Sequence, residues 1–232
     1  MESIDHSRHH CLIERREKSR LSVFFSGTDK TDGRFDFWRS GSAQNSSVLF
    51  FNNGLNEWYQ NGVPGVGESI PALARYIEKT AERLGATSIL LSGVSMGGYA
   101  AVLFGALLHA DVVAFGYDSK LRLPHSRSAK RMPKEVAMTV PDLKPIVKSS
   151  GARILHFAGE LDGMDMMAAH HMYDLENIQT YTLRGVGHGE RRSLTVGMDW
   201  RISWKAMRKG ANCPAYQRQR VPMRIPSPYR GC

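Results

Sequence analysis

The sequence contains few cysteines and no long hydrophobic run. Its 3 cysteines lie near the two ends of the 232-residue chain, and an odd number so placed does not form the disulfide framework of a small secreted domain. No apolar stretch approaches the roughly 20 residues that a membrane-spanning helix needs. The first part of the chain, up to Arg20, also lacks an apolar segment typical of a secretory signal. We therefore expect a cytoplasmic protein.

The sequence has no excess of charge outside its C-terminal part. Residues 184–232 contain 11 Lys/Arg and 2 Asp/Glu, so this stretch accounts for the whole formal net charge of +9. A basic tail can bind nucleic acid or another acidic partner, but such tails are more often solvated extensions. We rank nucleic-acid binding low, and we expect the Pro-containing residues 209–232 to be disordered.

Hydrophobic patterning predicts one domain of alternating strands and helices over residues 19–208, after a polar arm over residues 1–18. The 42% hydrophobic content suffices for one core. The predicted strands cover residues 21–26, 35–38, 47–51, 88–92, 111–115, 153–158 and 178–183. The predicted helices cover residues 68–84, 98–104, 142–148, 166–173 and 192–208. This alternation predicts an α/β fold with a mostly parallel sheet and helices on both faces.

Gly93, Ser95 and Gly97 form a G-x-S-x-G motif between a predicted strand and a predicted helix. A sharp strand-to-helix turn leaves little room for side chains, which explains the glycines, and it exposes the central serine. The helix that follows directs its first N–H groups and its positive dipole end at the same point. The motif predicts a nucleophilic serine, and the alternative is a serine that only caps the helix.

Through these three residues in this context, the chain resembles the α/β-hydrolase superfamily. The resemblance covers about residues 20–208 and implies a three-layer fold that hydrolyses acyl esters through an acyl-enzyme. It implies no metal and no organic cofactor. Many relatives insert a cap where this chain has only residues 116–150, which are too few for a full cap domain.

The resemblance also implies that an acid and then a histidine follow the nucleophile along the chain, each just after a strand. Asp162 is the first choice for the acid, Asp165 is the alternative, and Glu160 is a weaker third. The carboxylate without the catalytic role is expected to cap the next helix or to lie at the surface. His188 is the base, because it follows the last predicted strand and has a glycine on each side.

An oxyanion hole needs two N–H donors beside the nucleophile. The first is expected from Met96, which follows Ser95. The second is expected from the loop after the strand over residues 47–51, where Asn53 or Gly54 is our choice. This loop departs from the H-G-G-G sequence of lipases, and the alternative is a plain turn.

Two further segments bear on the substrate. Residues 56–65 combine aromatic and amide groups, which suit a sugar-like or other polar acyl substrate, although packing is the favoured role of Trp58 and Tyr59. Residues 116–150 carry basic side chains that suit an anionic or polar substrate, although a solvated loop is the favoured reading. These basic residues are Lys120, Arg122, Arg127, Lys130, Arg131 and Lys134.

The predicted function is a serine hydrolase that cleaves a carboxylic ester of a small or polar acyl substrate. A likeness to hydrolases associated with bacterial surface polysaccharides, in the loop after residues 47–51 and in the His188 loop, hints at a carbohydrate-linked substrate. Two alternatives stay open: an acyltransferase with the same triad, for example for sugar O-acyl transfer, and a non-catalytic binding protein on a hydrolase fold. A thioesterase is a close variant of the first reading.

Overall fold

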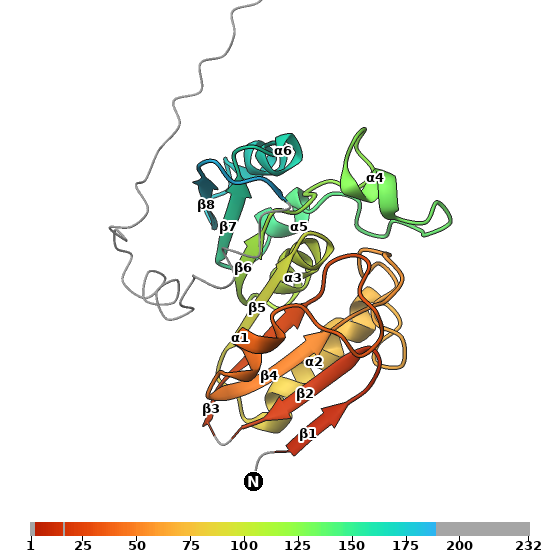
Figure 1. Cartoon of the computed structure of the whole chain (residues 1–232). Coiled ribbons are helices and arrows are strands. Elements are labelled where there is room, and N and C mark those ends of the chain that lie inside the picture. The colour runs from red at the N-terminus through yellow and green to blue at the C-terminus, as the bar shows by residue number, and fades with distance from the viewer. Residues whose placement is uncertain (1–2, 16, 189–232) are drawn as a thin grey trace, which may run out of the picture. The chain divides into compact units, whose positions relative to one another are not determined.

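A computed structural model describes residues 3–15 and 17–188 of the chain, and it centres on one eight-stranded sheet (Figure 1). The strand order is β1-β2-β4-β3-β5-β6-β7-β8. The strands are β1 (Ser3–His6), β2 (His10–Glu14), β3 (Glu17–Phe25), β4 (Ser46–Phe51), β5 (Ile89–Val94), β6 (Asp111–Phe115), β7 (Ile154–Gly159) and β8 (Ile178–Leu183). The helices are α1 (Trp38–Ser42), α2 (Ile70–Leu84), α3 (Met96–Leu107), α4 (Arg127–Arg131), α5 (Lys144–Lys148) and α6 (Gly163–Met172).

Strands β3 to β8 pair in parallel, whereas β1 and β2 join the edge in antiparallel fashion. Because the six parallel strands point the same way, the loops at their carboxyl ends meet along one edge of the sheet. The predicted α/β fold is confirmed. The predicted strands over residues 111–115 and 178–183 coincide with β6 and β8.

Alternating side chains of β3 face two different helical layers. Phe25 stacks on Phe104 of α3, with ring centroids 5.4 Å apart, whereas Phe24 stacks on Phe50 and on Phe37, next to α1. Successive side chains of a strand point to opposite faces, so both faces are apolar here and both need a cover. Figure 1 shows α1 in front of the sheet and α2 and α3 behind it, which gives three layers.

Residues 3–14 are part of the sheet and not the polar arm that the sequence predicts. Cys11, Leu12 and Ile13 of β2 are almost fully buried, and Leu12 pairs with Leu49 of β4. Three apolar residues among charged and histidine residues give only a weak strand signal in the sequence. Pairing with β4 supplies the hydrogen bonds and the burial that the local sequence does not reveal.

The predicted strand over residues 35–38 is wrong. Phe37 has a φ of 61°, and it leads directly into the short helix α1. The alternation of aromatic residues that suggested a strand places Phe35 and Trp38 on the ring of Phe50, at centroid distances of 5.9 and 5.1 Å. Aromatic packing onto the sheet therefore explains the pattern without strand pairing.

Helix α2 begins and ends as its sequence indicates. The Ser69 side chain accepts a hydrogen bond from the Ala72 amide, Pro71 lies in the first turn, and Gly85 ends the helix with a φ of 66°. The predicted helix over residues 192–208 and the predicted tail over residues 209–232 lie outside the described residues. No helix in the described ranges is long and apolar enough to cross a membrane.

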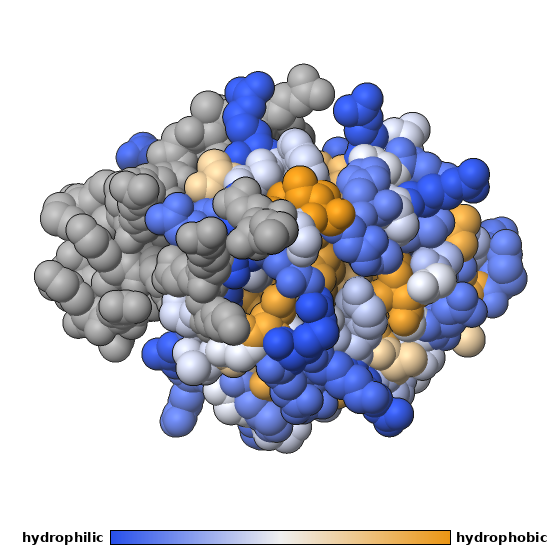
Figure 2. Space-filling model, turned by 90° about the horizontal axis from the view of Figure 1, so that it is seen from below, coloured by the Kyte–Doolittle hydropathy of each residue, from blue (hydrophilic) through white to orange (hydrophobic). Residues whose placement is uncertain are grey.

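A few large hydrophobic side chains are exposed among the described residues: Ile4, Trp38, Leu55, Leu107, Leu161, Met167 and Tyr173. Figure 2 shows one face, where hydrophobic patches are interrupted by polar residues. Exposed apolar side chains are ordinary on a folded domain.

Candidate active site

Ser95 lies at a strained corner between β5 and α3. Its φ of 59° and ψ of −121° place an ordinary L-residue in a region that is sparsely populated. The Ser95 amide donates to the carbonyl oxygens of Phe115 and Gly116, at 3.0 and 2.9 Å, so the end of β6 fixes the corner. This is the strand–turn–helix geometry that the G-x-S-x-G motif predicts.

The two motif glycines are required by close backbone contacts. A Cβ atom on Gly93 would collide with the carbonyl oxygen of Gly97, and a Cβ atom on Gly97 would collide with the carbonyl oxygen of Phe25. The first turn of α3 therefore packs directly on the ends of β5 and β3. This packing holds the Ser95 side chain at the carboxyl edge of the sheet.

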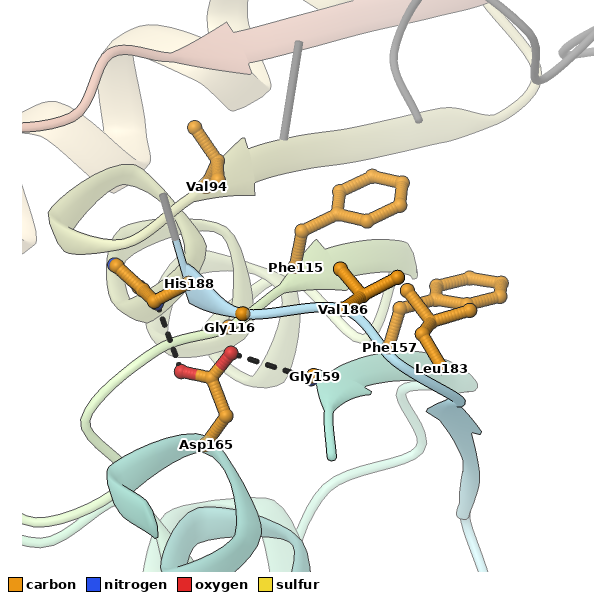
Figure 3. Close-up of a pocket in the computed structure, with 10 residues that line it drawn as sticks. Val94, Phe115, Gly116, Phe157, Gly159, Asp165, Leu183, Val186 and His188 are labelled. Carbon is orange, nitrogen blue, oxygen red and sulfur yellow. Dashed lines mark hydrogen bonds and ion pairs between the residues drawn. The ribbon is translucent and has the colours of Figure 1, made fainter. Parts of the chain in front are cut away.

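Ser95, His188 and Asp165 form a hydrogen-bonded row. His188 Nε2 lies 3.1 Å from Ser95 Oγ. On the other side of the ring, His188 Nδ1 lies 2.8 Å from Asp165 Oδ1, a contact that Figure 3 shows as a dashed line. The His188 and Asp165 side chains are only 12% and 3% exposed. A serine joined to an imidazole that is itself oriented by a carboxylate is the arrangement that activates a hydroxyl nucleophile.

The contact with His188 that the sequence assigned first to Asp162 is made by Asp165. Asp165 is 2% exposed, and its second oxygen accepts a hydrogen bond of 3.3 Å from the Gly159 amide. Gly116 has no side chain, and a Cβ atom there would crowd the Asp165 carboxylate. Asp165 lies in the first turn of α6, where the helix directs it back to the strand ends.

Asp162 has the alternative role that the sequence allowed for one of the two aspartates. Its Oδ1 accepts hydrogen bonds from the amides of Met164 and Asp165, at 3.0 and 2.9 Å, so it caps α6. Burial alone raises the pKa of Asp162, but the Asp165 amide and the Arg127 guanidinium outweigh burial and hold that pKa below its ordinary value. Glu160, the third choice, accepts from Thr182 Oγ1 at 2.8 Å.

Apolar side chains line one side of the Asp165–His188 pair. Figure 3 shows them at several strand ends and in the His188 loop: Val94, Phe115, Phe157, Leu183 and Val186. They limit the access of water to the pair from this side. Electrostatic interactions within the pair are correspondingly stronger than they are in water.

Asn53 and Gly54, the expected second oxyanion donors, follow β4, and β3 separates β4 from β5 in the sheet. The Gly54 amide donates to Asn52 Oδ1 at 3.0 Å, and its surroundings include His9. The role of these two residues as oxyanion donors stays a prediction.

The loop after β3 is the one that lies beside the nucleophile. A Cβ atom on Gly27 would lie 3.8 Å from Ser95 Cβ, and the Gly27 amide is engaged by Asp36 Oδ2 at 2.8 Å. The next amide, that of Thr28, makes no hydrogen bond within the described part of the chain. Met96, at the first position of α3, also has an N–H without an intrahelical partner. Met96 and Thr28 are therefore the candidate donors.

Trp58 and Tyr59 are packing residues. Both are fully buried, although both have positive φ values. The Tyr59 hydroxyl donates to the carbonyl oxygens of Ser26 and Phe51, at 3.0 and 3.3 Å. Tyr59 thus ties together the ends of β3 and β4, next to the loop that carries Thr28.

Several basic residues of the segment 116–150 form contacts within that segment or with the loop after β3. The Arg122 guanidinium donates to three carbonyl oxygens of its own segment, and Lys120 lies 3.7 Å from Asp142. Arg131 pairs with Asp29 of the loop after β3. The segment is therefore held in place by its own positive charges.

Arg127, which the sequence placed only in the basic rim, lies against the triad. Its Nη2 atom is 3.0 Å from Asp165 Oδ1 and 2.6 Å from Asp162 Oδ1, and its Nη1 atom is 3.4 Å from Asp118. No local pattern in the sequence links Arg127 to Asp165, because the contact depends on how the whole segment between β6 and β7 folds.

Asp162, Asp165 and His188 also offer possible metal-ligand atoms within 4.8 Å of one another. Both carboxylates are already in contact with the Arg127 guanidinium, which would repel a metal cation at this place. Asp162 is further engaged by two helix amides. The chemistry of this donor set fits an ion-paired network and not a metal centre.

Comparison with known proteins supports the fold assignment. No protein-family model and no curated protein sequence matches the chain. The structure is similar to the capsule O-acetyltransferase of Neisseria meningitidis serogroup A in complex with CoA, with a TM-score of 0.63 and 15% identity over 89% of this chain and 94% of that one. It is similar to MenH from S. aureus, with a TM-score of 0.59 and 14% identity over 88% and 99% of the two chains.

A third similar structure is the acylaminoacyl peptidase of Pyrococcus horikoshii, with a TM-score of 0.62 and 14% identity over 83% of this chain. This chain spans 38% of that peptidase. At these identities the similarities establish the fold, which is of the α/β-hydrolase type. These similar proteins are enzymes, but a shared fold does not by itself assign their activities to this chain.

Proposed function

We propose that this protein is a serine hydrolase that cleaves carboxylic esters of small or polar acyl substrates through an acyl-enzyme on Ser95. The observation that carries the proposal is the row of two short contacts, Ser95 Oγ to His188 Nε2 at 3.1 Å and His188 Nδ1 to Asp165 Oδ1 at 2.8 Å. The position of Ser95 at a corner with positive φ adds support.

In the proposed first step, Ser95 Oγ attacks the ester carbonyl carbon while His188 Nε2 takes the hydroxyl proton. Asp165 holds the imidazole in the tautomer that leaves Nε2 free to accept, and it stabilises the imidazolium that forms. The Met96 and Thr28 amides donate to the developing oxyanion. The C–O bond to the alcohol then breaks, and His188 returns the proton to the leaving oxygen.

In the second step, a water molecule gives its proton to His188 and attacks the acyl carbon. The bond to Ser95 Oγ breaks, and Ser95 regains a proton from His188. These steps use only groups of this chain. They require neither a metal nor an organic cofactor.

Acyl transfer is the second candidate function, with the hydroxyl of an acceptor replacing water. The observation that favours it is the similarity to the capsule O-acetyltransferase, which extends over 94% of that chain and over 89% of this one. Under this alternative the acceptor is a hydroxyl-bearing molecule, with a carbohydrate as the first class to try. The residues that form the acyl-enzyme are the same.

A fluorophosphonate probe tests the nucleophile. We expect one adduct by intact mass on the wild-type protein and none on Ser95→Ala. The matched control is Ser119→Ala, because Ser119 Oγ also lies 2.9 Å from a histidine nitrogen, that of His171, away from the row. Ser119→Ala is expected to label like the wild type. An adduct that persists in Ser95→Ala contradicts the proposal.

Product analysis separates the two functions. The protein is incubated with a short-chain p-nitrophenyl ester, with and without a carbohydrate acceptor. Free acid as the main product in both cases supports hydrolysis. Acylated acceptor formed at the expense of free acid supports transfer.

A further inference from the structure

Arg127 lies where three parts of the chain meet beside the candidate triad. It begins α4, and its guanidinium reaches Asp165 in α6, Asp162 at the start of α6 and Asp118 after β6. The Arg127 side chain is only 15% exposed, and the Asp118 side chain is 1% exposed. An arginine that bridges three carboxylates in a partly buried site is not an ordinary surface ion pair.

We infer that Arg127 is a positioning residue, which fixes the Asp165 carboxylate against His188 and offsets the excess negative charge around that pair. This inference rests on the proposed function, because it assigns His188 the role of a base. It adds a role for the short segment that stands where a cap domain would be. Arg127 acts through Asp165 and contacts no reacting atom.

The geometry at Asp165 Oδ1 supports the positioning role. This single oxygen accepts a hydrogen bond from His188 Nδ1 at 2.8 Å and forms an ion pair with Arg127 Nη2 at 3.0 Å. Asp165 Oδ2 is engaged by the Gly159 amide. The carboxylate is thus held from three directions, and loss of Arg127 leaves it with two.

Contacts at both ends of α4 hold Arg127 in place. The amide of Ser128 donates to Asp118 Oδ2 at 2.7 Å, so the same buried carboxylate fixes both the backbone and the side chain at this point. The Ser126 hydroxyl caps α4 by accepting from the Ala129 amide at 3.0 Å. At the other end of the helix, Arg131 pairs with Asp29 of the loop after β3.

The charges around His188 support the other role of Arg127, which is to offset excess negative charge around the Asp165–His188 pair. Among the described residues, the charged and titratable groups next to the Asp165–His188 pair are Arg127 of α4, Asp162 at the start of α6 and His156 of β7, and Asp118 after β6 contacts the same Arg127 guanidinium. Desolvation lowers the pKa of the fully buried His156 to about 4, so it is neutral near pH 7. Three carboxylates therefore share one guanidinium, and removal of that guanidinium makes protonation of His188 easier.

The test follows the pH dependence of the rate at which a fluorophosphonate labels Ser95, from about pH 5 to about pH 9, the range in which histidines titrate. Labelling requires neutral His188, so the rate falls at acid pH. In Arg127→Gln we expect the midpoint of this fall to move up by about one pH unit. Arg127→Lys keeps the charge without the bidentate fork, and we expect it to recover part of the shift.

Two further variants act as controls. Lys130 is exposed on the same helix, so Lys130→Gln removes an equal charge without touching the network and is expected to keep the wild-type midpoint. Asp162→Asn removes one carboxylate and retains a good helix cap, and it is expected to move the midpoint down. Thermal unfolding of each variant checks that the labelled protein is folded.

The experiment distinguishes failure of the inference from failure of the proposed function. Folded Arg127→Gln with the wild-type midpoint overturns the inference, whereas absence of labelling at Ser95 in the wild type overturns the proposed function instead. If Arg127→Gln does not fold, Asp162→Asn decides. A wild-type midpoint in folded Asp162→Asn overturns the charge-balancing role.

Discussion

The nucleophile side and the acid side of the candidate site are built in different ways. At the nucleophile, backbone atoms make the decisive contacts, because Gly93 and Gly97 let the first turn of α3 approach β5 and β3. At the acid, charged side chains make the decisive contacts, because Arg127, from a separate segment, forms ion pairs with both Asp165 and Asp162. The first side depends on a few adjacent residues, and the second depends on the whole fold.

This difference predicts that two aspartates three residues apart tolerate substitution very differently. Asp165→Asn removes the charge that orients His188, and we expect kcat for an activated ester to fall by about 10³- to 10⁴-fold. Asp162→Asn retains the helix cap, and we expect a loss of less than about tenfold. Steady-state hydrolysis at neutral pH measures both. A larger loss in Asp162→Asn than in Asp165→Asn would reverse our assignment of the acid.

A pair of glycine substitutions tests the backbone contacts on the nucleophile side. Gly97→Ala forces a methyl group against the carbonyl oxygen of Phe25, and we expect it to lower the free energy of unfolding by about 3 kcal/mol or more. Gly163→Ala, in α6, meets nothing within 4 Å and is expected to be neutral or to stabilise by up to about 1 kcal/mol. Urea denaturation compares the two variants. Equal effects would show that the close approach of α3 is not what requires glycine.

His156 gives a pH-dependent test of the buried environment behind the acid. Desolvation lowers the pKa of His156 from 6.5 to about 4 in the folded protein. Between these values the unfolded chain binds a proton that the folded protein does not, so stability falls as the pH falls from about 6.5 to about 4. The expected loss from this group is about 3 kcal/mol.

Denaturant unfolding at several pH values measures this loss, with His156→Leu as the comparison. Both ring nitrogens of His156 lack a hydrogen bond within the described part of the chain, so leucine removes no such contact there. The variant is expected to lose less stability on acidification than the wild type. An identical pH dependence in both proteins would show that folding does not lower the pKa of His156.

The smallest effect is expected for an exposed ion pair. Arg153 contacts Asp111 through two hydrogen bonds of 2.8 and 2.7 Å, but its side chain is 67% exposed. Solvent screens such pairs, so Arg153→Gln is expected to change the free energy of unfolding by at most about 1 kcal/mol. The same measurement on Arg127→Gln is expected to give a larger loss, because that variant leaves buried Asp118 without its cation.

The sequence predicted those parts of the molecule that local patterns encode. The α/β fold is confirmed, because apolar strands and helices alternate along the chain, and the turn at Ser95 has its own motif. His188 follows the last described strand, as its position between glycines indicates. Each of these features depends on residues that are adjacent in the chain.

The sequence could not place those features that depend on spatial neighbours. The aromatic alternation at residues 35–38 suggested a strand, and β1 and β2 were not foreseen. The choice between Asp162 and Asp165 depends on which carboxylate the first turn of α6 directs at His188. The contact of Arg127 with Asp165 depends on the fold of a whole connecting segment.

Formation of an acyl-enzyme at Ser95 is the central step of the proposed mechanism. Rapid mixing with an activated short-chain ester, followed by acid quenching and peptide mass spectrometry, locates any acyl group on the chain. We predict an added acyl mass on the peptide that contains Ser95, with slower accumulation in Asp165→Asn. Turnover of the ester with no acyl group at Ser95, or with the group on another residue, would contradict the account.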